Sequence, residues 1–271
     1  MQDATRQEGG APPGEAVAQF EATEGIGRRI AHILYSAPAL VPFIVLLVAV
    51  AIFGLLLGER FFSPFALTLI LQQVAIIGIV ASAQSLVILT AGIDLSVGAV
   101  MILSSVVMGK FTMDLGLPPA LGVFCGLLCG FLCGTISGWL VADWKLPPFI
   151  VTLGMWQIVL AANFLYSGSE VIRSQDIARE APLLQFFGRT IEIGGAVFTY
   201  GVILLLVLVA LLSYVLSQTA WGRHVYAVGD DKEAAELSGV NVRRTLISVY
   251  ALGGLICAFA GWALIGRIGS V

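Results

Sequence analysis

The chain has 271 residues, of which 58% are hydrophobic and only 11% are charged, and its mean hydropathy is +0.97. This composition excludes an ordinary soluble domain and predicts a membrane protein. The net charge of −3 and the pI near 5.4 give no basic surface, so nucleic acid is not expected as a partner.

The first thirty residues are polar, acidic and rich in Gly and Pro. They lack the apolar core of a signal peptide, so the sequence predicts a mobile cytoplasmic tail over residues 1–36 and a transmembrane domain over 37–271.

Apolar stretches with the length of a membrane-spanning helix recur along this domain. They lie near residues 39–58, 65–90, 95–109, 119–141, 148–167, 197–217 and 245–265. A transmembrane barrel would show shorter segments of alternating polarity. We therefore predict an all-α, polytopic transmembrane helix bundle with about seven spans.

Orientation follows from the positions of Lys and Arg, which favour the cytoplasmic side. If the spans alternate, one side carries Arg28, Arg29, Lys145, Arg223, Lys232, Arg243 and Arg244. This bias predicts an inner-membrane protein with a cytoplasmic N terminus. Residues 168–196 are then periplasmic, and the loop 217–244 is cytoplasmic.

The stretch 122–138 carries a small residue at every fourth position. The glycines are Gly122, Gly126, Gly130, Gly134 and Gly138, and Cys125, Cys129 and Cys133 follow the same spacing. A thiolate metal site would need charge compensation that no neighbour supplies. The glycine pattern instead indicates a helix that another helix approaches closely.

One acidic residue interrupts the apolar sequence between Arg60 and Lys110, in "TAGIDLSVG" at 90–98. A helix can break at membrane depth only where protein or a water-lined cavity surrounds it. We expect Gly92 to end one helix in the left-handed conformation and Asp94 or Ser96 to cap the next. A structural cap is favoured for Asp94, and a direct role in transport stays open.

Polar residues also mark the helix before this break. Gln73 and Gln84 are eleven residues apart and share a helix face, which suits either a hydroxyl-rich solute or interhelical hydrogen bonds. The candidate translocation path is Gln73, Gln84, Thr90, Asp94 and Ser96.

The loop 217–244 carries the signals of a short helix. Asp230 is expected to cap it with Glu233 three residues later, Ala234 and Ala235 favour helix, and Gly239 supplies the stop. These residues would present a small helix to the cytoplasm.

"EAAELSG" at 233–239 resembles the EAA coupling motif of permease subunits in ATP-binding-cassette (ABC) importers. Together with "LTAGIDLSVGA", "KLPPFIVTLGMW" and "LIGRIGSV", it resembles the ribose-type branch of sugar permeases from about residue 39 onward. "FIVTLGMWQIVLAANFLYS" and "IRSQDI" are most similar to the fructose permeases of that branch, whose systems are associated with fructose, ribose and mannose.

The resemblance implies a permease subunit that gives a monosaccharide a path across the membrane. It implies a second permease copy, an ABC ATPase docked on Asp230, Glu233, Ala234, Ala235 and Gly239, and a periplasmic sugar-binding protein. ATP and Mg²⁺ are expected in the ATPase, since the chain has no phosphate-binding G-x-x-x-x-G-K-[ST] loop. No metal, cofactor or catalytic residue is expected here, and the chain is not expected to be an enzyme.

Two alternatives remain open. Broken helices also suit an ion-coupled secondary carrier, although a carrier has no need of a docking helix. The resembled family has about ten spans, so we expect the chain to be truncated at its C terminus, either as part of a longer permease or as a remnant that does not transport.

Overall fold

The computed structural model describes residue 37 and residues 39–271. The predicted tail, 1–36, therefore lies outside the described residues. The chain divides into two compact units, Met1–Gly58 and Glu59–Val271. The described part of the first unit is α2 (Leu40–Leu57), an apolar helix with no buried residue, which ends where Gly58 takes a φ of 56°. Its apolar surface on every face suits lipid.

The second unit is a helix bundle with one small hairpin. After the turn η1 (Gly58–Arg60) come α3 (Pro64–Ile88), α4 (Val97–Met113), α5 (Pro119–Asp143), α6 (Pro148–Ser167), α7 (Ser174–Glu180), η2 (Phe186–Gly188), β1 (Thr190–Ile193), β2 (Ala196–Thr199), α8 (Tyr200–Gln218), α9 (Ala220–Asp230), α10 (Lys232–Leu237) and α11 (Val242–Ile268).

The described residues hold six helices that are long and apolar enough to cross a membrane, which confirms the predicted helical bundle. The remaining predicted span, 95–109, corresponds to α4, which is apolar but has only 17 residues. Its length of roughly 25 Å is shorter than the hydrocarbon core of roughly 30 Å. The break before Val97 takes up the residues that would have completed this span.

The centre of the second unit is α11, and about two thirds of the residues in its most apolar part are buried. It packs against α5, where glycines remove the side chains between the two backbones. A Cβ on Gly130 would lie 2.5 Å from the carbonyl oxygen of Gly254, and one on Gly138 would lie 2.9 Å from the Cα of Ile247. The packing interpretation of the glycine pattern is therefore confirmed.

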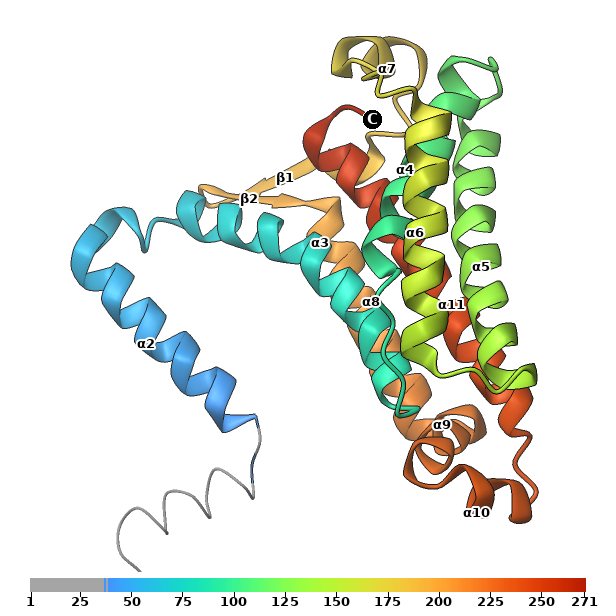
Figure 1. Ribbon diagram of the computed structural model, residues 1–271. Coiled ribbons are helices and arrows are strands. Elements are labelled where there is room, and N and C mark those ends of the chain that lie inside the picture. The colour runs from blue at the N-terminus through green and yellow to red at the C-terminus, as the bar shows by residue number, and fades with distance from the viewer. Residues whose placement is uncertain (1–36, 38) are drawn as a thin grey trace, which may run out of the picture. The chain divides into compact units, whose positions relative to one another are not determined.

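The two ends of the bundle carry different elements (Figure 1). One end carries α7 and the C-terminal end of α11, and the other carries α9 and α10. The predicted periplasmic segment 168–196 and the predicted cytoplasmic loop 217–244 thus lie at opposite ends of α8.

A two-stranded hairpin, which was not predicted, joins α7 to α8. Its strands pair antiparallel from Thr190 with Thr199 to Ile193 with Ala196. The turn between them is Gly194–Gly195, and both residues have positive φ, as a tight hairpin turn requires. The Val197 amide donates to Thr68 Oγ1 at 3.2 Å, which attaches the hairpin to the start of α3.

Candidate functional site

The break between α3 and α4 begins with a turn in which backbone hydrogen bonds end α3. The amide of Ala91 donates to the Ile88 oxygen at 2.9 Å, and that of Gly92 donates to the Val87 oxygen at 3.1 Å. With these two hydrogen bonds, Ala91 is the residue that adopts the left-handed conformation, with a φ of 56°. The prediction that Gly92 takes this conformation is wrong by one residue.

Gly92 is needed for a different reason, because a side chain at this position would collide with its neighbours. A Cβ at this position would lie 2.8 Å from the hydroxyl oxygen of Tyr250 and 3.0 Å from Cγ1 of Val87. The glycine therefore lets α11 approach the break, while the helix ends one residue earlier.

Asp94 holds the turn that leads into α4. Its Oδ1 accepts the Ser96 amide at 2.7 Å and the Ser96 hydroxyl at 2.6 Å. Ser96 occupies the N-cap position but makes no side-chain cap bond to α4, because its hydroxyl is used by Asp94. This geometry favours the structural interpretation of Asp94, and a contact with solute remains a prediction.

The other candidate path residues are only partly brought together. Thr90 is buried in the break, and its hydroxyl donates to the Val87 oxygen at 2.8 Å. Gln84 is partly buried, and its Oε1 has no hydrogen-bond partner among the described residues. Gln73 lies three turns earlier on α3 and is exposed. The break thus gathers Thr90, Asp94 and Ser96 but not Gln73.

Two residues that contact the break were missed at the sequence level. Thr152 in α6 donates its hydroxyl to the Ile93 oxygen at 3.1 Å. Tyr250 in α11 is buried, and its hydroxyl reaches Gly92. A hydroxyl-bearing aromatic residue inside a glycine-rich span was the available signal for Tyr250.

The loop 217–244 contains two short helices, α9 and α10, with the junction between them at Asp231. Asp231 is extended, with φ −151° and ψ 113°, and its Oδ1 accepts the amides of Glu233 at 2.9 Å and Ala234 at 3.0 Å. The predicted cap, Asp230, is instead the last residue of α9. The prediction was wrong because α9 continues for one residue more, which gives the capping conformation to Asp231.

The end and the faces of α10 partly match the prediction. Gly239 has a φ of 85°, which confirms the predicted stop. Ala235 is 4% exposed and packs into the hydrophobic core, so the prediction that it lies on the exposed face of this helix is wrong. The outward side carries Glu233 and Ala234, and Leu237 at the end of α10 is 90% exposed.

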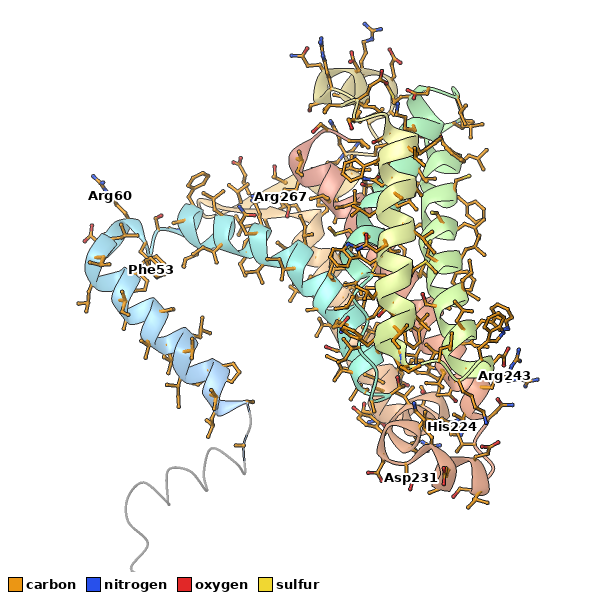
Figure 2. The ribbon with its side chains drawn as sticks, in the orientation of Figure 1. Phe53, Arg60, His224, Asp231, Arg243 and Arg267 are labelled. Carbon is orange, nitrogen blue, oxygen red and sulfur yellow. The ribbon has the colours of Figure 1, made fainter. Side chains whose placement is uncertain are left out.

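The loop is attached to the spans by an ion pair. The Arg243 guanidinium, at the start of α11, donates to both carboxylate oxygens of Asp143 at the end of α5, with an Nη2–Oδ2 distance of 2.8 Å. Figure 2 shows Arg243, His224 and Asp231 at one end of the bundle and Arg267 toward the other. A cavity of about 410 Å³ separates α10 from the α5–α6 connection, and Lys145, Lys232, Glu233 and Glu236 are among its lining residues.

Comparison with known proteins gives the family. Residues 66–271 match a family described as "Branched-chain amino acid transport system / permease component". The fructose import permease protein FrcC of Rhizobium meliloti is 66% identical over 94% of this chain and 71% of its own length. The ribose import permease protein RbsC is 38% identical in Bacillus subtilis and 33% identical in Escherichia coli K12, each over 84% of this chain and 69% of the relative. No solved structure matches.

The match to FrcC covers 94% of the chain, so it begins well before residue 39, where the resemblance was expected to start. The predicted resemblance to ribose-type sugar permeases is confirmed. These relatives are permeases of transport systems rather than enzymes. The chain belongs to this family of transport-system permease components, and the fructose and ribose import permeases are among its relatives.

Proposed function

We propose that this permease carries a monosaccharide of the fructose, ribose or mannose class, with energy from ATP hydrolysis in a separate ABC ATPase. The observation that carries the proposal is the 66% identity to a fructose import permease over nearly the whole chain. The importer also contains a sugar-binding protein and a second permease copy. The protein lies in the inner membrane with a cytoplasmic N terminus, and ATP and Mg²⁺ bind to the ATPase.

The break between α3 and α4 is proposed as part of the sugar path. A neutral sugar presents hydroxyl groups that need hydrogen-bond partners when water is removed. Gln84 offers an amide oxygen that no described residue occupies, and Asp94 uses only Oδ1 for its bonds to Ser96. These acceptors suit sugar hydroxyls, which act as donors.

The outward side of α10 is proposed as the contact with the ATPase. Asp231 caps this helix and Gly239 ends it, so the short element has a defined start and stop. Leu237 presents an apolar side chain beside Glu233, and such an anchor fits a groove on a partner. The ion pair between Arg243 and Asp143 then joins this loop to α5 and α11.

The opposite end of the bundle is proposed to receive the sugar-binding protein. A hollow of about 420 Å³ lies there, and Ser174, Gln185, Arg189 and Arg267 are among its lining residues. Two guanidinium groups make this hollow suitable for carboxylates on a soluble partner.

Uptake measurements test the sugar class and the energy source. Cells that express the complete importer should accumulate labelled D-fructose, D-ribose or D-mannose, and cells that lack this chain should not. A protonophore should leave uptake intact while ATP is held constant. Loss of uptake under that condition would identify an ion-coupled carrier instead.

Substitution of Leu237 tests the docking surface. Leu237→Asp should leave insertion and stability unchanged, because the side chain is 90% exposed. It should lower ATPase retention by about tenfold or more, because it places a charge in an apolar contact. Leu115→Asp is the matched control, since Leu115 is 61% exposed in the α4–α5 connection at the opposite end. Equal ATPase retention in the two variants would contradict docking through α10.

A further inference from the structure

Tyr250, a residue of α11, packs tightly against α5. Its side chain is 1% exposed. A Cβ on Gly134 would overlap the carbonyl oxygen of Tyr250, and a Cβ on Gly138 would lie 2.9 Å from the Tyr250 Cβ. The backbone of Tyr250 therefore lies in the space that the two α5 glycines leave open.

The other end of the side chain touches the break. The hydroxyl oxygen lies 2.8 Å from the position that a Cβ on Gly92 would occupy. This hydroxyl is buried and has no hydrogen-bond partner among the described residues. A buried hydroxyl without a partner destabilises the conformation that contains it. In this conformation a phenylalanine would fill the same space without that cost.

The break offers partners close to this hydroxyl. The amides of residues 93, 94 and 95 donate no hydrogen bond to any described residue. The second carboxylate oxygen of Asp94, Oδ2, accepts no hydrogen bond from any described residue. A phenol can donate to a carboxylate or accept from an amide, so a small shift of the break relative to α11 would satisfy both groups.

The position of Tyr250 along α11 connects it to the cytoplasmic loop. Only residues 238–241 separate α10 from α11, and Tyr250 lies about two turns after the start of α11. A displacement of α10 thus reaches Tyr250 through one continuous helix, which the Arg243–Asp143 ion pair also ties to α5.

We propose that Tyr250 is a positioning residue for transport: its hydroxyl hydrogen-bonds to the 93–95 segment in another state of the cycle, and movement of α11 thereby shifts the break. The inference rests on the proposed docking of an ATPase at α10. The unpaired hydroxyl makes the present state easier to leave, and the new bond stabilises the state that follows.

Tyr250→Phe in the complete importer tests this inference, because it removes one oxygen and keeps the ring. The variant should insert normally and be at least as resistant to heat as the wild type. Its maximal rate of D-fructose uptake should fall about tenfold, while the half-saturating sugar concentration stays unchanged. Ser104→Ala is the control, since the Ser104 hydroxyl is also buried and unpaired among the described residues but lies beside Gly130 in α5.

A wild-type maximal rate in Tyr250→Phe would overturn the inference. A raised half-saturating concentration with an unchanged maximal rate would also overturn it, because it would identify a direct sugar contact. An equal loss of rate in Ser104→Ala would show a general effect of buried hydroxyls and would overturn it too.

A second readout does not depend on which sugar is carried. Ile93 is 52% exposed, so Ile93→Cys can report on the break in a chain whose four native cysteines are replaced by alanine. Labelling of this cysteine by a maleimide should change when the ATPase is trapped with nucleotide and vanadate, and Tyr250→Phe should abolish the change. If the importer takes up none of the tested sugars, the sugar proposal fails and labelling still decides the role of Tyr250. Labelling that does not change with nucleotide, or that changes equally with Tyr250 and with the Tyr250→Phe substitution, would contradict the proposed role of Tyr250.

Discussion

Asp94 uses a single carboxylate oxygen for both of its hydrogen bonds to Ser96. An asparagine can place its amide oxygen in the same position, so Asp94→Asn should keep the turn, assembly and most transport. Asp94→Leu removes both acceptor contacts and should lower the free energy of unfolding by about 2 kcal/mol. Thermal unfolding of the purified variants measures this difference. Loss of transport in a normally folded Asn variant would instead make Asp94 a residue of the sugar path.

Single residues show which local features the sequence predicted correctly and which it placed one residue away from their observed position. The break, the capped helix and the Gly239 stop were predicted because small polar residues and glycine have strong local preferences. The errors at Gly92 and Asp230 are one residue each, since the exact helix end depends on which carbonyls find partners. The burial of Ala235 depends on packing against distant helices, which its local sequence does not encode.

At the scale of elements, the α5 glycines meet two different helices. A spacing of four residues advances the helix face by roughly 40° at each step, so the row winds around α5. Gly122 and Gly126 therefore face α4 at Thr112 and Met108, whereas Gly130, Gly134 and Gly138 face α11. The sequence predicted that another helix approaches these glycines closely. It did not predict that the row of glycines winds around α5 and so contacts two helices, α4 and α11.

The two kinds of glycine in the spans give a matched prediction. Gly134→Ala would push a methyl group into the backbone of α11 and should destabilise the protein by about 1–3 kcal/mol. Gly154→Ala in α6 meets nothing within 4 Å and should be neutral or stabilising by up to about 1 kcal/mol. Thermal unfolding in one detergent compares them directly. Equal midpoints would contradict tight packing between α5 and α11.

The hairpin, like α7 and α9, is an element that the sequence analysis missed. "TIEIGGAVFT" alternates apolar and polar residues before a Gly-Gly turn, which is a hairpin signal. Its first strand lies in the predicted periplasmic segment 168–196, whereas most of its second strand was assigned to the predicted span 197–217. By contrast, long apolar helices were predicted well, because their length alone identifies them.

The two ends of the bundle carry different elements, α7 at one and α9 and α10 at the other. Exposed residues at each end can therefore test the orientation of the protein in the membrane. Arg179 in α7 has an 81% exposed side chain, and Leu237 at the opposite end is 90% exposed. In a chain without native cysteines, Arg179→Cys should react with a membrane-impermeant maleimide added to spheroplasts. Leu237→Cys should react only after the membrane is opened. The reverse pattern would invert the proposed topology.

The space that the α5 glycines leave open also bears on how the protein is made. Gly134 and Tyr250 lie 116 residues apart in the chain, so at about 5–20 residues per second the ribosome needs roughly 6–23 seconds to supply Tyr250 after Gly134. During that interval the bare backbone of α5 faces lipid or another protein. Biogenesis therefore includes a waiting period in which this surface is open to wrong partners, and membrane insertases or neighbouring early helices have time to shield it.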